Sequence, residues 1–344
     1  MKKVIRTIIQ YAIFFGIGAG LVWWQISGMT QEEKKQFVLS LENAHYIYLV
    51  PVLIIGLLSH YLRALRWKLL IDPIKPVSAS NSFYAVMIGY LGNTFIPRAG
   101  EILRCTMLNR YEKVPFSSLL GTVIAERGFD MVSFLLFTLL TVLIQIGAVG
   151  NFITEKLKTI FHSGEDKPSF WIHITFFIFI IWFLFWIINF IFKRFSDRSW
   201  IKKAKGIWDE LKGGLITIFH LKKKTEFILY TMLIWVCYTS QIYIGFKALD
   251  ITTNLGFPVA MSVLTLSTVA MIVAPGGLGA FPIALQQALL IYGIHNISFG
   301  WLVWGANTLI IIAAGLICLG LMIYQNRNKL KRAHPANEDL SKEI

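Results

Sequence analysis

The sequence predicts an all-α polytopic integral membrane protein, with about six full transmembrane spans and two broken re-entrant hairpins in an inverted repeat. Three observations lead to this fold class. Hydrophobic residues make up 56% of the 344 positions. Several apolar runs reach the roughly 20 residues that a helix needs to cross a hydrocarbon core about 30 Å thick. Two further apolar regions are interrupted near the middle by Pro and Gly.

Six continuous apolar runs are long enough to be spans. In chain order they are roughly 5–26, 46–66, 118–148, 170–192, 226–246 and 301–324. The first follows the basic start MKKVIR and continues apolar to Trp24 without a small-residue cleavage signature. We therefore expect it to be retained as a helix, not removed as a signal peptide.

The interrupted regions, roughly 80–112 and 257–294, contain 97-PRAG-100 and 275-PGGLG-279. Their limbs are short for a span at a rise of about 1.5 Å per residue. The span 46–66 returns the chain to the cytoplasmic side, where we expect Arg63 and Arg66 to lie. If residues 80–97 then crossed the membrane alone, the basic clusters that follow would lie outside, against the positive-inside rule. We therefore expect 80–112 to enter and leave on the cytoplasmic side. The same reasoning makes 257–294 a hairpin from the opposite side.

The two halves of the chain follow the same order: span, amphipathic connector, span, broken hairpin, span. The connector 30–45 opens with a capping-box pattern at Thr30 and Glu33, and 199–220 has apolar residues every three or four positions. We expect one domain over 1–344, made of repeats 5–149 and 170–325 and a cytoplasmic tail 326–344. Opposed broken helices are typical of transporters. The alternative is that alternating spans and hairpins resemble a repeat by chance.

The basic charge is concentrated beside the predicted spans. The formal net charge is +14, with clusters at 193–205, 222–224 and 327–332. Such positions fit anionic lipid headgroups better than a nucleic-acid groove. The three cysteines, Cys105, Cys237 and Cys318, have neither metal-ligand spacing nor the pattern of a disulfide framework. We expect no nucleic acid, metal or cofactor, and the sequence does not indicate the oligomeric state.

Charged residues follow the interruption of the first hairpin. Arg98, Glu101 and Arg104 are spaced i, i+3, i+6, so they form one stripe on a helix that starts at Pro97. Gly100 permits close backbone approach. A helix N-terminus with added arginines is suited to a phosphate or carboxylate headgroup. The alternative is that the arginines reach the cytoplasmic interface and Glu101 only neutralises them.

A second charged group lies early in the predicted span 118–148, at 125-AERGFD-130. Glu126 and Asp130 share a helical face, with Arg127 beside them. Three charges in a span are costly unless they are paired or face water. We expect Arg127 to pair with an acid of its own helix or with Glu101, and Glu126 or Asp130 with an arginine of the hairpin. Such a network acts either as a gate or as a structural link.

The second hairpin is interrupted by Pro275, Gly276, Gly277 and Gly279. Backbone that bends at membrane depth lies against protein or a water-filled cavity, so these residues are candidates to contact the headgroup with N–H groups. We expect one of Gln286 and Gln287 to face the interior. His60 and Asn307, single polar residues in spans, are expected to be satisfied structural groups.

Four segments together resemble the flippase-like transmembrane region of the lysylphosphatidylglycerol synthase family, also described as dolichol-phosphate-glucose-synthetase-like. They are 62-LRALRWKLLI-71, 93-NTFIPRAGEILR-104, 125-AERGFD-130 and 275-PGGLGAF-281. The resemblance covers about residues 5–325 and implies an inner-membrane protein that moves or binds lipids. Where family members often have a glutamate after the second glycine element, this chain has 281-FP-282. The chain ends about twenty residues after its last predicted span, so we expect no aminoacyl-transferase domain and no enzyme activity.

The sequence thus favours a lipid translocator in the bacterial inner membrane, with both termini cytoplasmic. Its ligand would be an anionic or polyprenyl-phosphate headgroup, bound at the two hairpin tips. One alternative is a membrane scaffold for envelope assembly. Another is a glycosyl or phosphoryl transferase that acts on a polyprenyl carrier, although the connectors are short for a sugar-nucleotide site.

Overall fold

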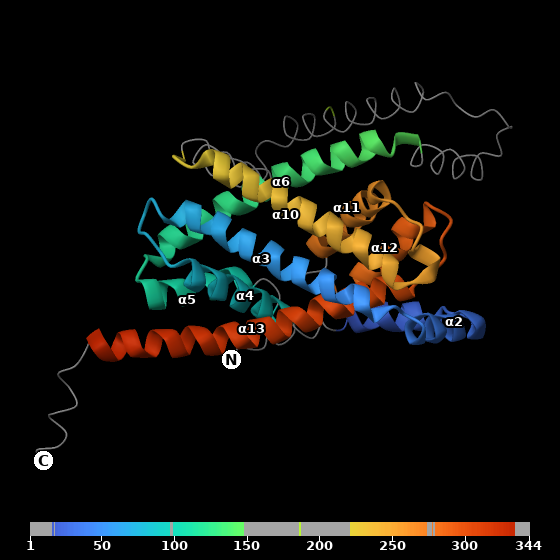
Figure 1. Ribbon diagram of the computed structural model, residues 1–344, viewed down its shortest axis with the longest axis horizontal. Coiled ribbons are helices and arrows are strands. Elements are labelled where there is room, and N and C mark those ends of the chain that lie inside the picture. The colour runs from blue at the N-terminus through green and yellow to red at the C-terminus, as the bar shows by residue number, and fades with distance from the viewer. Residues whose placement is uncertain are drawn as a thin grey trace, which may run out of the picture.

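The computed structural model describes residues 16, 18–96, 99–147, 186, 221–273, 277 and 279–333. These residues form helices joined by turns and contain no strand (Figure 1). Four helices are long and apolar enough to cross a membrane: Tyr46–Ile71, Phe116–Ile144, Lys224–Ala248 and Ser298–Arg327. They match four of the predicted spans, so the chain is an all-helical polytopic membrane protein. The predicted span 170–192, apart from Trp186, the connector 199–220 and most of 5–26 lie outside the described residues.

The first half contains α2 (Gln31–Glu42), η1 (Tyr46–Tyr48), α3 (Leu49–Ile71), α4 (Ala79–Phe95), α5 (Gly100–Glu112) and α6 (Phe116–Ile144). The second contains α10 (Lys224–Gly245), η2 (Phe246–Ala248), η3 (Asp250–Thr252), α11 (Phe257–Val273), α12 (Ala280–Leu290) and α13 (Ser298–Ala333). The predicted capping box of α2 is confirmed, with Thr30 and Glu33 bonded reciprocally. One predicted boundary was wrong, because the helix after the first interruption begins at Gly100, not Pro97. α13 continues as far as Ala333, and the assignment of 326–344 to a cytoplasmic tail stays a prediction.

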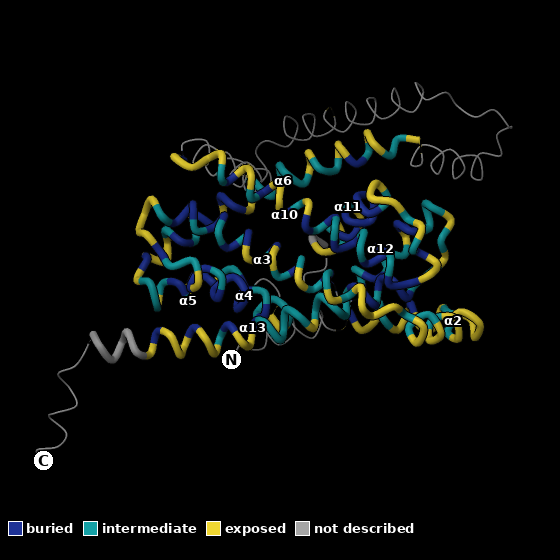
Figure 2. Tube along the Cα trace, in the orientation of Figure 1, coloured by how far each residue is buried: buried dark blue, intermediate teal, exposed yellow. Residues whose placement is uncertain are grey.

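The antiparallel helices α3 and α10 lie against each other in the middle of the molecule, and buried residues are spread over α3, α4 and α10 (Figures 1 and 2). They approach closely at Gly56, where an added Cβ would lie 2.6 Å from Gln241 Nε2. The same Gln241 amide donates to the Val52 carbonyl at 3.0 Å and to Asn307 Oδ1 at 3.3 Å. Small residues and polar side chains are the usual means by which helices associate within a membrane, where the hydrophobic effect between them is weak.

Two helical hairpins pack around this pair. The hairpin α4–α5 starts at one end of the molecule and α11–α12 at the other, and each turns back inside it (Figure 1). α4 lies against α13, and α11 against α6. α5 lies beside α6, and α12 beside α13. Each packing contact of the first hairpin thus has a counterpart in the second.

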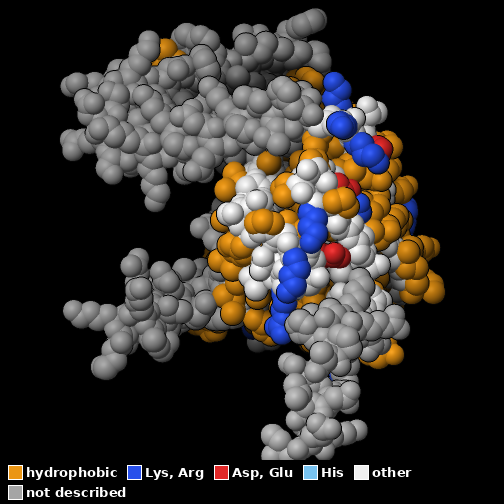
Figure 3. Space-filling model, turned by 90° about the vertical axis from the view of Figure 1, so that its left-hand side faces the viewer, with side chains coloured by type: hydrophobic (Ala, Val, Ile, Leu, Met, Phe, Trp, Pro, Cys, Tyr) orange, Lys and Arg blue, Asp and Glu red, His pale blue; other side chains and the backbone are white. Residues whose placement is uncertain are grey.

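Basic side chains collect at the end of the molecule where α3 and α5 finish and α10 begins. Lys and Arg form a band across that end (Figure 3). The exposed members are Lys75, Arg110, Lys113, Lys222, Lys223, Lys224 and Arg327. The first hairpin therefore opens from the basic end of the molecule.

Candidate functional site

Seven charged side chains from α3, α5 and α6 meet beside the first hairpin, and we call them the arginine–carboxylate cluster. The members are Arg63, Arg66, Glu101, Arg104, Glu126, Arg127 and Asp130. α6 presents its charges about 15 Å along its axis from Phe116, since ten residues separate Phe116 from Glu126 at a rise of about 1.5 Å each. Charged side chains this far along a membrane-spanning helix require partners of opposite charge, and the cluster supplies them.

Glu126 is the centre of the cluster. Its side chain is 0% exposed and contacts three guanidinium groups. Arg63 Nε and Arg66 Nη2 donate to Oε1 at 3.1 and 3.0 Å. Arg104 Nη2 lies 2.9 Å from Oε2. One carboxylate therefore links α3, α5 and α6.

Asp130 lies one helical turn after Glu126 and binds the same two arginines of α3. Arg66 Nη2 donates to Asp130 Oδ1 at 2.5 Å, and Arg63 Nη2 donates to Oδ2. Arg66 also donates to Thr231 Oγ1 of α10 at 3.2 Å, and Arg63 to the Tyr90 hydroxyl of α4 at 2.9 Å. The i, i+4 spacing on α6 thus holds α3 in a fixed register.

Arg104 is buried, with a side chain that is 6% exposed. Its guanidinium lies over the ring of Trp67, 4.6 Å from the centroid, and Trp67 Nε1 donates to Thr122 Oγ1 at 3.0 Å. Arg104 Nη2 and Glu126 Oε2 are close enough for an ion pair, but they do not meet the angles of a hydrogen bond. Within the described part of the chain, Arg104 Nε and Nη2 have no hydrogen-bond partner. A buried donor without an acceptor is costly, and an acceptor from a ligand would satisfy it.

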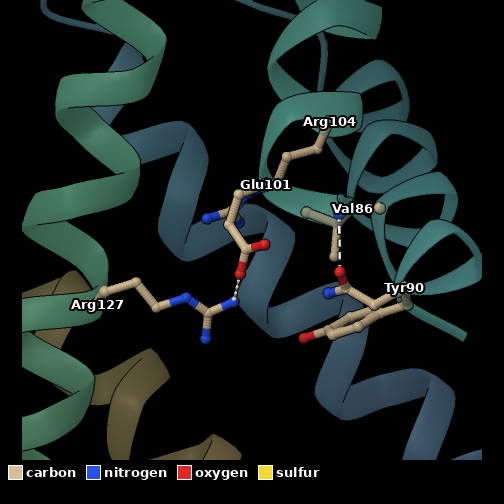
Figure 4. Close-up of a pocket in the computed structure, with 8 residues that line it drawn as sticks. Val86, Tyr90, Glu101, Arg104 and Arg127 are labelled. Atoms are coloured by element: carbon tan, nitrogen blue, oxygen red, sulfur yellow. Dashed lines mark hydrogen bonds and ion pairs between the residues drawn. The ribbon is translucent and has the colours of Figure 1, made fainter. Parts of the chain in front are cut away.

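A small pocket opens between α4, α5 and α6, and Arg104 lines its wall (Figure 4). The complete lining is Val86, Gly89, Tyr90, Asn93, Gly100, Glu101, Arg104 and Arg127. Glu101 reaches from α5 across to Arg127 of α6, which donates from Nη2 to Glu101 Oε1 at 2.7 Å. These two side chains are 27% and 44% exposed, unlike the buried members of the cluster. The pairing of Arg127 with Glu101, suggested by the sequence, is present.

Gly100 permits close approach between the two limbs of the hairpin. A Cβ there would lie 2.3 Å from the Gly89 carbonyl oxygen and 2.6 Å from the Asn93 amide. The Gly100 N–H donates to Asn93 Oδ1 at 2.7 Å. This N–H, which the sequence suggested would face a headgroup, is therefore used inside the hairpin.

The cluster carries an excess of positive charge. Among the described residues, four guanidinium groups face three carboxylates, which leaves one positive charge. Arg98, the sequence candidate for the first headgroup contact, and Pro97 lie outside the described residues. In the described ranges, no group of three or more His, Cys, Asp or Glu side chains could hold a metal ion. The chemistry that this cluster offers is electrostatic binding of an anion.

The second hairpin has different surroundings. Gly277 and Gly279 have φ of +67° and +74°, and a Cβ on Gly279 would lie 2.9 Å from Leu21 Cβ of the N-terminal helical segment. Both glycines are buried by close packing, whereas Pro275 and Gly276 lie outside the described residues. The role of these glycines as headgroup contacts stays a prediction.

The polar residues of the second hairpin and the spans form local contacts. The predicted inward-facing glutamine is Gln286, which accepts from Gln25 Nε2 at 3.2 Å. Gln25 in turn accepts from Trp301 Nε1 at 3.1 Å. Asn307 is satisfied by Gln241, as expected. For His60 the expectation was wrong: its buried Nδ1 has no hydrogen-bond partner in the described ranges, and its ring lies tilted against that of Tyr90, with the ring centroids 4.6 Å apart.

Sequence reasoning missed Arg63 and Arg66 as members of the cluster, because it assigned them to the cytoplasmic end of their span. Their i, i+3 spacing, followed at once by Trp67, was the available signal. Two arginines one turn apart on an apolar helix need acids on a neighbouring helix, and 125-AERGFD-130 supplies them. Tyr90 and Asn93 gave no signal in the sequence.

Comparison with known proteins identifies the family. The model of the lysylphosphatidylglycerol synthase transmembrane region matches residues 8–315. A UPF0104 membrane protein of Methanothermobacter thermautotrophicus is 26% identical over 270 residues, 70% of this chain and 74% of the relative. A UPF0104 membrane protein of Methanocaldococcus jannaschii is 30% identical over 121 residues, 34% of each chain. No solved structure matches. The chain therefore belongs to the family of the lysylphosphatidylglycerol synthase transmembrane region, as the four sequence segments suggested.

Proposed function

We propose that the protein is a lipid translocator that binds an anionic or polyprenyl-phosphate-type headgroup in the pocket of the first hairpin. The observation that carries the proposal is Arg104. It lines the pocket, is 6% exposed, and leaves its Nε donor without an acceptor among the described residues. A phosphate oxygen is a strong acceptor for a guanidinium donor.

The charge of the cluster supports an anionic ligand. One uncompensated positive charge inside a membrane protein is costly, and it makes the pocket attractive to a negatively charged headgroup. Exposed apolar side chains on the helices that carry the pocket residues support a lipid in particular. Ile102 of α5 and Ile124 of α6, near Glu101 and Arg127 in the sequence, are exposed apolar side chains that suit hydrocarbon. The headgroup of a lipid would reach the arginines while its tails stay in the bilayer.

The arrangement of the two halves supports transport. We propose an inverted repeat of six spans and two re-entrant hairpins, with both termini on the cytoplasmic side of a bacterial inner membrane. Matching contacts of α4 with α13 and of α11 with α6 support the repeat, and the basic band at one end supports the orientation. In such transporters, one half rocks against the other around a central site.

Two further parts of the site follow from the sequence. We propose that Arg98 adds a positive charge at the hairpin tip, and that the segment from Pro275 to Gly279 shapes the opposing tip. The ion pairs of Glu126, Arg127 and Asp130 would rearrange when the headgroup moves, since each carboxylate already faces more than one arginine. The same ion pairs can therefore stabilise one conformation and act as a gate when they rearrange.

A transport assay in liposomes tests the proposal. The purified full chain is reconstituted with fluorescent anionic, zwitterionic or polyprenyl-phosphate lipid, and a membrane-impermeant quencher reports how much label becomes accessible. We expect faster access for one anionic headgroup class and its loss in Arg104→Lys, because lysine lacks the guanidinium fork. Arg110→Lys, on the exposed end of the same helix, is the matched control. Rates equal to protein-free liposomes for every probe would contradict the proposal.

A further inference from the structure

We propose that Glu101 is an intramolecular competitor for the headgroup, a role that rests on the proposed function. Its carboxylate holds Arg127 when the pocket contains no ligand. A lipid phosphodiester with one negative charge displaces it, entering sideways between α5 and α6, and then binds Arg104 and Arg127 together. Glu101 thereby sets how tightly the pocket holds its ligand and how readily it releases it.

The position of Glu101 is the first ground for this role. It lies in the first turn of α5, where the helix dipole favours a negative charge. It lines the same pocket as Arg104, three residues later on the same helix. A second negative group in the pocket would therefore compete with Glu101 for the same positive potential.

The weakness of its only ion pair is the second ground. Among the described residues Glu101 pairs with one arginine, at 2.7 Å, and both side chains are partly exposed. Glu126, in contrast, is fully buried and contacts three arginines. Partly exposed ion pairs contribute little, so the Glu101 pair is the one that a ligand can open without dismantling the cluster.

Charge balance gives the class of ligand. With Glu101 in place the described cluster has four positive and three negative charges. When Glu101 swings out and one phosphodiester enters, one negative charge replaces another, and the buried site keeps its charge. A doubly charged phosphomonoester would neutralise the cluster completely and bind too tightly for Glu101, with its single charge, to displace it again. The exchange therefore favours a phosphodiester.

The exposed side of the pocket gives the route. Arg127 is 44% exposed, and the neighbouring Ile102 and Ile124 are exposed at 57% and 36%. Glu101 spans the space between α5 and α6 and lies in front of Arg104 (Figure 4). A lipid that arrives through the bilayer meets Glu101 and Arg127 before it meets Arg104.

Lipid binding to the purified full chain tests this role. We would titrate phosphatidylglycerol in mixed micelles, with phosphatidylcholine and phosphatidic acid as comparison lipids, and measure the dissociation constant. Glu101→Gln removes the competing charge and should tighten phosphatidylglycerol binding about twofold to fivefold, the range that a partly exposed ion pair sets. The same variant should slow transport in liposomes, because the headgroup is released less readily. Glu226→Gln, which removes a partly exposed carboxylate paired with Lys223, is the matched control.

The outcomes separate this inference from the proposed function. Unchanged or weaker phosphatidylglycerol binding in Glu101→Gln overturns the competitor role, even when the wild type prefers anionic lipid. If Glu101→Gln does not fold, Glu101→Asp moves the charge away from Arg127 and should also tighten binding. If inorganic phosphate displaced the lipid at equal concentration, the claim that a lipid enters sideways between α5 and α6 would be overturned. A wild type without preference for anionic lipid would instead contradict the proposed function.

Discussion

The two hairpins have the same architecture and opposite chemistry. Each consists of two short helices that turn back inside the molecule, with one limb against the last long helix of the other half. The segment from Ala79 to Glu112 contains five charged residues, and the segment from Phe257 to Leu290 contains none. The first hairpin is joined to α6 by the buried ion pair of Arg104 with Glu126, and Glu126 in turn pairs with Arg66 of α3. The second is joined to its neighbours by close packing and amide contacts.

This difference indicates a division of roles between the hairpins. A buried ion-pair network rarely adds net stability over apolar packing, because burying the charges is costly. Packing alone suffices for the second hairpin. The charges of the first hairpin are therefore consistent with the binding role proposed for them.

The largest expected effect comes from the centre of the cluster. Within the described cluster, Glu126→Gln leaves Arg63 and Arg66 with the partly exposed Asp130 as their acidic partner and removes the acidic partner of Arg104. Removing one partner of a buried pair costs about 3 to 5 kcal/mol. We expect a large drop in Tm in detergent, measured by scanning fluorimetry, and little change for Glu226→Gln. An unchanged Tm in Glu126→Gln would contradict the view that buried ion pairs hold the first hairpin in place while packing holds the second.

Glycine substitutions compare the packing of the two hairpins. Gly100→Ala places a Cβ 2.3 Å from the Gly89 carbonyl oxygen, and Gly279→Ala places one 2.9 Å from Leu21 at a positive φ. Overpacking costs about 1 to 3 kcal/mol, and we expect both variants to lose stability by that amount. Gly121→Ala on α6 is the control, because a Cβ added there meets no heavy atom within 4 Å apart from the adjoining backbone of its own helix. This variant should be neutral or slightly stabilising. Equal Tm values for all three would contradict the close approach in both hairpins.

A smaller effect is expected at the amide contact of the second hairpin. Gln286→Leu removes the acceptor of Gln25, and polar contacts within membranes average about 0.6 kcal/mol. We expect a slight loss of stability and no change in the dissociation constant of phosphatidylglycerol. A loss of lipid binding as large as in Arg104→Lys would place part of the headgroup site in the second hairpin.

The smallest effect concerns α2, outside both hairpins. The hydrogen bond from the Thr30 backbone N–H holds the pKa of Glu33 below its ordinary value of 4.5. Since the folded pKa is lowered, the capping contribution is present above pH 4.5 and is lost as pH falls below it. Amide exchange in the first turn of α2, corrected for the intrinsic rate, should therefore rise at low pH. Thr30→Ala should show the raised exchange at neutral pH as well, and hairpin amides should not respond to either change.

The sequence by itself determined the class of the protein and its helices. Long apolar runs predicted the four described spans, because the cost of unpaired backbone in hydrocarbon leaves few alternatives to a helix. Pro and Gly in short apolar regions predicted both hairpins. The residues Glu101, Arg104, Glu126, Arg127 and Asp130 were identified because charge is rare in such segments.

Only the tertiary structure decided which charges meet. Arg63 and Arg66 join the cluster because α3 packs beside α6, and the sequence placed them at an interface instead. The Gly100 N–H is bonded to Asn93, seven residues earlier, and Gly279 packs against the N-terminal segment. Such pairings depend on how helices distant in the sequence approach one another, and periodicity within one helix does not contain that information. The same packing leaves the Arg104 donor beside the pocket, and on that position the proposed anion site depends.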